Sequence, residues 1–250
     1  MPRGKETRPP AQSPARVRRG YFECRYGQLH VYHAMPPGGG FEEGMALLCL
    51  HDLSGSARML SGLLSLVGQE RSVYAPDLPG FGESDAPPAP ATIADYAAAL
   101  ADFLDNTRLR QLAVVGVRLG ALLAAELAVA RPAQVTRVAL VSVPLLTESE
   151  RRAAPVELPA PAGPDEAFRP REWQRWALEA AANYALRERL GRVTQRLLVL
   201  RPRDDLWEAT GRVREVLPAA RPIELEAPGL ELLAHAPQQL AATVREFLRG

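Results

Sequence analysis

The chain has 250 residues, of which 47% are hydrophobic and 24% charged, and its formal net charge is +1 at pH 7. These proportions are ordinary for a globular protein and imply no polyanionic partner such as nucleic acid. The length suits one α/β domain, no apolar run approaches the length that spans a bilayer, and two cysteines fit a reducing compartment. We therefore expect a cytoplasmic protein with no membrane partner.

Residues 1–19 form a segment of distinct composition. Six Arg or Lys residues against the single Glu6 give this segment a charge of +5, and it is rich in proline and lacks aromatic residues. Such a segment cannot bury enough apolar surface to order itself, so we predict a disordered basic tail. The residues after Arg18 and Arg19 form no apolar run, which argues against an export signal.

Strands and helices are expected to alternate along the rest of the chain. Apolar runs with polar or glycine boundaries predict strands, and apolar positions three and four apart predict helices. The predicted strands are 21–26 and 28–34, a hairpin around Gly27, then 46–50, 71–75, 111–115, 138–143, 196–200 and 223–226. The predicted helices are 57–67, 92–104, 118–131, one ending near residue 216, and 237–248.

Residues 147–195 are predicted to be a lid inserted into this core. Four prolines between 155 and 164 rule out a regular element there, whereas 171–190 has the spacing of one long amphipathic helix. Its apolar face would carry Trp173 and Trp176. The core would then comprise residues 20–146 and 196–250.

This order of elements predicts the fold class. Strands that alternate with helices form a doubly wound, mostly parallel α/β sheet, and ligands bind outside the carboxyl ends of its strands.

The most informative motif lies between the strand at 111–115 and the next helix. The sequence Gly116-Val-Arg118-Leu-Gly120 is the frame of a G-x-S-x-G nucleophile elbow with arginine in the serine position. A guanidinium stays protonated and has no lone pair to attack a carbonyl carbon. An acyl-serine mechanism is therefore excluded at this position.

Through these motifs, the chain resembles the α/β-hydrolase superfamily over about residues 20–249. The resemblance rests on Leu-Cys-Leu-His at 48–51, Asp-Leu-Pro-Gly-Phe-Gly-Glu-Ser at 77–84, the elbow at 116–120, and two aspartates after the strand at 196–200. The motif at 77–84 is typical of the epoxide hydrolase, haloalkane dehalogenase and C–C hydrolase branch. The resemblance implies a hydrolase fold with a small helical lid.

The resemblance also implies where a catalytic triad would lie, and this chain departs from it. The nucleophile position is Arg118, and the acid position is Asp205 or, one residue earlier, Asp204. The histidine position falls on Leu230, which cannot accept a proton; His235 is the nearby imidazole. The triad is therefore expected to be degenerate.

The oxyanion hole of the family uses backbone N–H groups, which here would belong to Leu53 and Leu119. Asp52 stands where the family commonly has glycine, so a carboxylate is expected beside the hole and would disfavour an oxyanion. His51 and Cys49 are expected to pack structurally, the thiol as a small hydrophobe in a buried strand.

These departures leave three hypotheses for Arg118. The first is an internal ion pair with Asp205 or Asp52 that closes the pocket. The second is a binding site for a small acidic molecule beneath Trp173 and Trp176.

The third hypothesis is an active hydrolase or lyase with a divergent site around Arg118, Asp205 and His235. No metal and no cofactor are expected under any of the three. Protein partners, oligomeric state and the role of the tail stay open.

Overall fold

The computed structural model describes residues 14–38, 45–53, 55–153, 171–227, 229–234 and 236–250. Within them, eight strands form one sheet in the order β1-β2-β4-β3-β5-β6-β7-β8. The pairs β1–β2 and β2–β4 are antiparallel and the other pairs are parallel. The strands are β1 Arg18–Cys24, β2 Gly27–Ala34, β3 Ala46–Leu50, β4 Val73–Pro76, β5 Leu112–Val117, β6 Val135–Val141, β7 Arg196–Pro202 and β8 Ile223–Leu225.

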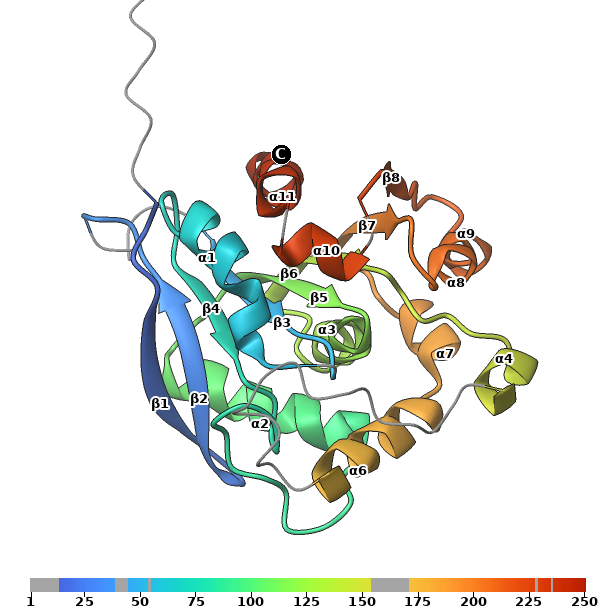
Figure 1. Ribbon diagram of the computed structural model, residues 1–250, viewed down its shortest axis with the longest axis horizontal. Coiled ribbons are helices and arrows are strands. Elements are labelled where there is room, and N and C mark those ends of the chain that lie inside the picture. Colours follow the sequence, from blue (N-terminus) through green and yellow to red (C-terminus); the bar gives the residue numbers. More distant parts are fainter. Residues whose placement is uncertain (1–13, 39–44, 54, 154–170, 228, 235) are drawn as a thin grey trace, which may run out of the picture.

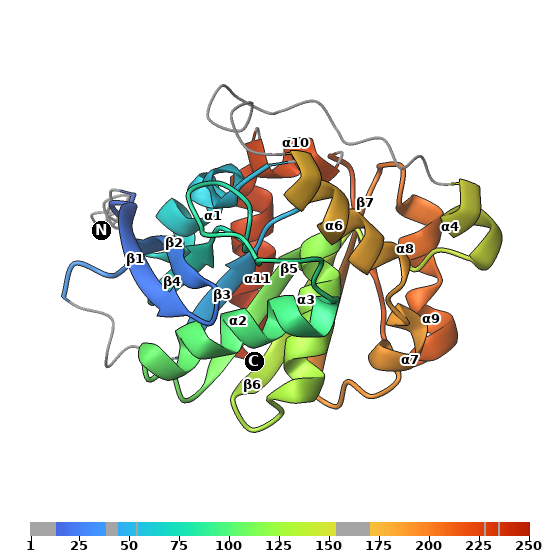
Figure 2. The same ribbon diagram turned by 90° about the horizontal axis from the view of Figure 1, so that it is seen from below.

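Helices cover both faces of the sheet, as expected of the doubly wound α/β fold (Figure 1). Helices α1, α10 and α11 pack on one face; α2 and α3 pack side by side on the other (Figure 2). The helical elements are η1 Ala57–Leu60, α1 Ser61–Val67, α2 Ile93–Asn106, α3 Leu119–Ala130, α4 Glu148–Ala153, α6 Arg171–Ala182, α7 Leu186–Leu190, α8 Trp207–Gly211, α9 Val213–Val216, α10 Gly229–Ala234 and α11 Pro237–Arg249.

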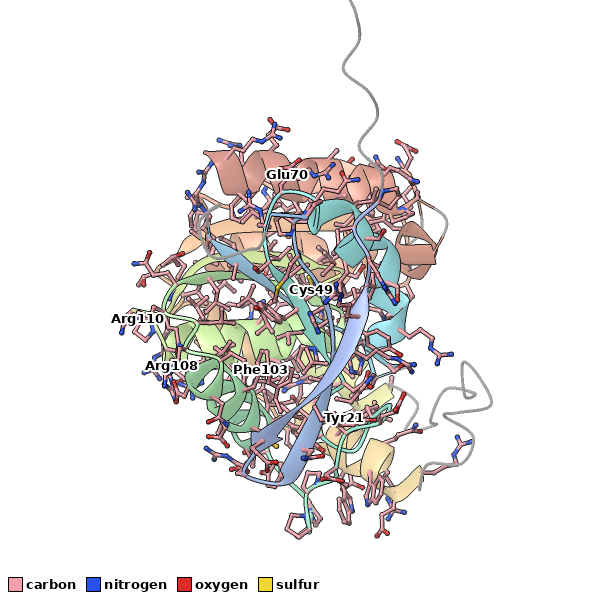
Figure 3. The ribbon with its side chains drawn as sticks, turned by 90° about the vertical axis from the view of Figure 1, so that its left-hand side faces the viewer. Tyr21, Cys49, Glu70, Phe103, Arg108 and Arg110 are labelled. Atoms are coloured by element: carbon pink, nitrogen blue, oxygen red, sulfur yellow. The ribbon has the colours of Figure 1, made fainter. Side chains whose placement is uncertain are left out.

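The central strands are buried on both faces. Every residue of β3 and of β5 is buried, which explains why these strands read as continuous apolar runs. Side chains alternate between a core under α2 and α3 and a core under α1 and α11. Cys49 lies inside β3, and burial raises the pKa of its thiol, so it packs as a small hydrophobe (Figure 3).

A buried carboxylate organises the turn after β4. Asp77 accepts hydrogen bonds from the backbone N–H groups of Ala57 and Glu83 and from Nδ1 of His30, at 2.7, 3.0 and 2.8 Å. Burial opposes ionisation of Asp77, but these hydrogen bonds outweigh it and lower its pKa. Gly82 has a φ of +50°, and a Cβ there would lie 2.0 Å from the Asp77 carboxylate. The motif at 77–84 is thus explained as a turn wrapped around Asp77.

The structure departs from the predicted elements in several places, and one of them is the helix predicted to end near residue 216, which is instead two helices, α8 and α9. Strand β1 begins at Arg18, two residues inside the predicted tail, of which residues 1–13 lie outside the described part. The predicted single helix at 171–190 is instead two helices, α6 and α7. Asn183 Nδ2 donates to the carbonyl of Glu179 at 2.9 Å, where α6 ends. The short helices α4 and α10 were not predicted.

None of the helices in the described residues has both the length and the apolar character that a bilayer crossing requires. In the same residues, there is no group of three or more His, Cys, Asp or Glu side chains arranged to hold a metal ion.

Candidate functional site

The nucleophile elbow keeps its backbone geometry with arginine in the serine position. Arg118 has φ 52° and ψ −112° between β5 and α3, a conformation in which a residue other than glycine is strained. A Cβ on Gly116 would lie 2.3 Å from the carbonyl oxygen of Gly120. A Cβ on Gly120 would lie 2.3 Å from the carbonyl oxygen of Leu50. Both glycines are therefore required by close packing of the backbone.

The side chain of Arg118 forms a two-pronged ion pair with Asp205. Nη1 lies 2.7 Å from Oδ1 and Nη2 lies 2.9 Å from Oδ2, so the guanidinium and carboxylate meet edge to edge. The Arg118 side chain is 20% exposed, whereas that of Asp205 is 68% exposed. Pairing with Asp205 is one of the two pairings expected from the reach of an arginine at this position, and the carboxylate partner is largely exposed.

Two further carboxylates surround the same guanidinium. Arg118 Nε lies 3.5 Å from Asp52 Oδ2, and Nη1 lies 3.8 Å from Asp204 Oδ2. Three carboxylates around one cation leave a formal charge of −2. They also offset the unfavourable placement of a cation at the start of α3, where the helix dipole is positive.

The titration of these groups follows from the contacts. Burial alone would lower the pKa of Arg118, but hydrogen bonding to Asp205 and the attraction of Asp52 outweigh it and raise the pKa. The hydrogen bonds from Arg118 in turn lower the pKa of Asp205. The pair is therefore ionised throughout the neutral pH range.

Asp52 occupies the side of the expected oxyanion hole. The backbone N–H of Leu119, one of the two expected donors, points to Asp52 Oδ1 at 3.4 Å. The Asp52 residue is buried, at 6% exposure. A buried carboxylate beside this N–H repels a second anion, which is the opposite of what an oxyanion hole must do.

Both ring nitrogens of His51, just before Asp52, are hydrogen-bonded to backbone groups. Its Nε2 accepts a hydrogen bond from the N–H of Leu78 at 2.9 Å, so Nδ1 carries the proton and donates to the carbonyl of Asp52 at 2.6 Å. His51 is completely buried. Its role is to hold the loop, as expected.

The two candidate acids have different surroundings. Asp204 accepts from Ser142 Oγ at 2.6 Å and from the N–H of Leu206 at 3.0 Å, and its side chain is buried. A Cβ on Gly229 would lie 2.1 Å from Asp204 Oδ2. Asp204 therefore faces the chain next to the expected histidine position, and Asp205 pairs with Arg118.

The expected histidine position offers no base in the described residues. Leu230 lies in α10, directly after Gly229, and only its backbone is described. His235 lies outside the described residues.

The space beside the elbow is filled by apolar side chains. Leu53, Phe81, Leu119 and Ala177, among others, enclose a cavity of only about 10 Å³. That is roughly the room of one water molecule. The hydroxyl of Tyr96, which also lines this cavity, has no hydrogen-bond partner in the described residues. A substrate cannot enter unless these side chains move.

The residues of α6 that were predicted to belong to a lid lie in different surroundings. Trp173 packs against the turn at Gly80, where an added Cβ would lie 3.1 Å from the Cβ of Trp173. Trp176 lines a second, larger cavity. Ala177, which sequence reasoning did not single out as a site residue, is the α6 residue that lines the small cavity with Leu53 and Leu119.

Sequence reasoning also missed a buried charged cluster between α3 and the segment that follows α6. Glu126 of α3 accepts from Tyr184 Oη and from Arg189 Nη2, each at 2.8 Å. The signal was available, because Glu126 is the one charged residue in the otherwise apolar segment 119–130. A buried charge requires partners, and both come from the short segment 184–189.

Comparison with known proteins identifies the class. The family profile described as alpha/beta hydrolase fold matches residues 46–201, more than half of the chain. The chain therefore belongs to the alpha/beta hydrolase fold family. The matched stretch contains Asp52 and the elbow and ends before Asp204 and Asp205.

Curated relatives match only in part. The uncharacterized protein Rv2715 of Mycobacterium tuberculosis (strain ATCC 25618 / H37Rv) is 34% identical over 99 residues, which are 40% of this chain and 29% of that protein. The dihydrolipoyllysine-residue acetyltransferase component of the acetoin cleaving system of Cupriavidus necator is 38% identical over 105 residues, or 42% of this chain and 27% of that protein. The matches thus span less than a third of the length of these relatives.

Solved structures resemble the whole fold. The enol-lactonase from Burkholderia xenovorans LB400 superposes with a TM-score of 0.75 at 19% identity, covering 92% of this chain and 100% of that one. A hydrolase from Pseudomonas aeruginosa PA01 gives 0.75 at 21% identity, with coverage of 93% and 98%. Naproxen esterase from Bacillus subtilis gives 0.70 at 20%, with coverage of 94% and 92%. At these identities the likeness concerns the fold alone.

Proposed function

We propose that this chain is a non-catalytic member of its family, in which Arg118 and Asp205 close the former active site. The observation that carries this proposal is the two-pronged pairing of Arg118 with Asp205 at 2.7 and 2.9 Å. An arginine that is tied to a carboxylate by both its Nη atoms is committed to structure rather than to a reacting group. We also propose that the chain belongs to the branch of epoxide hydrolases, haloalkane dehalogenases and C–C hydrolases, of which the motif at 77–84 is typical.

Three further features support the loss of hydrolysis. The guanidinium of Arg118 cannot act as a nucleophile, and Leu230 cannot act as a base. Asp52 places negative charge against the N–H of Leu119, where a tetrahedral intermediate would need stabilisation. The adjoining cavity of about 10 Å³ has no room for an acyl chain. On this proposal the chain lacks the nucleophile, the base, a favourable oxyanion site and room for a substrate.

The test is hydrolysis of short p-nitrophenyl esters by the wild type and by Arg118→Ser, Arg118→Ala and Asp205→Ala. We expect all four proteins to show the same slow background rate, because binding and remaining dipoles alone can give weak catalysis. Asp105→Ala is the matched control, since Asp105 forms a similar two-pronged pair with Arg131 on the surface. A substantial wild-type rate that is lost in Arg118→Ala or Asp205→Ala would instead establish a divergent enzyme.

A second candidate function is the binding of a small acidic molecule at Arg118. The observation in its favour is the 68% exposure of the Asp205 side chain, which a ligand carboxylate could replace on the guanidinium. The neighbouring Asp52 and Asp204 count against it, because they already make the site negative. We therefore rank it below the closed site.

Thermal-shift measurements with acetate and phosphate separate the two candidates. For the closed site we expect acetate to raise the melting temperature of Asp205→Ala, where it replaces the lost carboxylate, and to leave the wild type unchanged. Stabilisation of the wild type that disappears in Arg118→Ala would support the acidic ligand and overturn the first ranking.

A further inference from the structure

A second cavity, of about 380 Å³, lies behind the lid and separate from the Arg118 site. It is bounded by the start of α2, by α3, and by the lid helices α6 and α7. Figures 1 and 2 both show α6 next to the first turn of α2. Neither Arg118 nor any of its three carboxylate neighbours lines this cavity. Its size falls in the range of small-molecule sites.

The floor of this cavity is built from a buried charge that is already satisfied. Glu126 is 4% exposed, and its two oxygens accept separately from Tyr184 Oη and Arg189 Nη2. Arg189, the cation among the described lining residues, is thus neutralised by Glu126. Glu126 and Arg189 together therefore contribute no net charge to the cavity.

The net negative charge of the cavity comes from two glutamates of α6 and α7. Glu179 and Glu188 line the cavity, and Glu179 is 3.7 Å from the exposed Arg175, a contact that solvent weakens. Three carboxylates and one guanidinium line the cavity, so its formal charge is −2. The same walls include the indole of Trp176, the aromatic group that attracts cations most strongly.

Apolar groups complete the cavity on the side of α2. Pro90, Ala91 and Ile93 lie opposite Ala180 of α6 among its lining residues. A ligand that fits must therefore combine a positive charge for the carboxylates and the indole with an apolar body.

We propose that this cavity, lined by Trp176, Glu179 and Glu188, binds a small amine with an apolar or aromatic body in its protonated form. The ammonium group is placed between the carboxylates and against the indole, and the body packs on the residues at the start of α2. Binding is non-covalent and does not depend on the Arg118 site.

Isothermal titration calorimetry with three probes of the same shape tests the charge requirement. The probes are benzylamine, which is protonated at pH 7, neutral benzyl alcohol and anionic benzoate. We expect saturable binding of benzylamine at least about fivefold tighter than that of benzyl alcohol, since a close charge pair near a surface contributes about 1 kcal/mol or more. Added salt should weaken the binding of benzylamine. Equal binding of the amine and the alcohol, or no saturable binding of benzylamine, overturns the proposal.

Variants locate the site. Glu179→Gln combined with Glu188→Gln should weaken benzylamine binding by about fivefold or more. Trp176→Leu should weaken it by at least about twofold. Glu246→Gln combined with Glu226→Gln, an equal change of charge at two exposed positions that do not line the cavity, should bind as the wild type does. Because both lid glutamates are exposed, their replacement should leave the melting temperature near the wild-type value. Unchanged affinity in the double glutamine variant and in Trp176→Leu would place the amine elsewhere and contradict the proposal.

Discussion

At the scale of single residues, the elbow is distinguished by the charges that surround it. Arg118 brings a permanent cation to the elbow, and Asp52, Asp204 and Asp205 gather around it. A serine elbow needs a base and a hole that stabilises negative charge. This chain has instead an arginine that needs negative charge and carboxylates that supply it.

The pairing gives Asp205 a testable pH dependence. The hydrogen bonds from Arg118 lower the pKa of Asp205 in the folded protein below its value of about 4 in the unfolded chain. A group of this kind stabilises the fold at pH above the unfolded-state pKa, and this stabilisation is lost as pH falls through the lower folded-state pKa.

We therefore expect Asp205→Asn to be less stable than the wild type at pH 7, with the difference shrinking as pH falls below about 4. Urea midpoints measured from pH 7 to pH 3 check this. The buried Asp77 keeps part of the acid sensitivity in both proteins, because its pKa is also lowered. A difference between the two proteins that does not change with pH would contradict the role given to Asp205.

At the scale of elements, the elbow depends on close contact between the backbones of β5, α3 and β3. Gly120 lets the first turn of α3 lie against the end of β3, where the nearest atom to an added Cβ is the carbonyl oxygen of Leu50 at 2.3 Å. Backbone atoms of a central strand cannot move without disturbing the sheet.

Gly120→Ala should therefore destabilise the protein by about 3 kcal/mol or more, measured by urea unfolding. Gly38→Ala is the matched control, because a Cβ there meets none of the described atoms within 4 Å. That control should change stability by less than about 0.5 kcal/mol. Similar stability of Gly120→Ala and the wild type would mean that the elbow is not as tightly packed as described.

The segment of α6 and α7 illustrates what local sequence patterns miss. The spacing of Trp173, Trp176 and Tyr184 predicts one continuous helix, but helix α6 ends at Ala182. After the break, Tyr184 reaches Glu126, a residue 58 positions earlier in the chain. Helical periodicity contains no information about such a long-range partner.

At the scale of the whole molecule, the sheet was predictable because its central strands are buried on both faces. Strand β3 has the predicted bounds, since a short apolar run between polar loops has few alternatives. A pairing of Arg118 with a carboxylate was also predictable. The fold brings the ends of β5 and β7 to the same edge of the sheet, and an arginine side chain is long enough to reach a carboxylate there.

The choice between Asp204 and Asp205 could not be made from sequence. The two carboxylates differ by one position, and the turn after β7 points one to Ser142 and the other to Arg118. The volume of the small cavity beside the elbow could not be predicted either, because it depends on how closely Ala177 packs against Leu53 and Leu119. Turn conformation and side-chain packing are tertiary properties.

The central proposal is that the pairing of Arg118 with Asp205 closes the site at the elbow, and a double-mutant cycle tests this pairing most directly. The free energy of unfolding is measured for the wild type, Arg118→Ala, Asp205→Ala and the double variant. We predict a favourable coupling of about 1 kcal/mol, since Arg118 is largely buried although solvent screens Asp205. A coupling indistinguishable from zero would contradict the account.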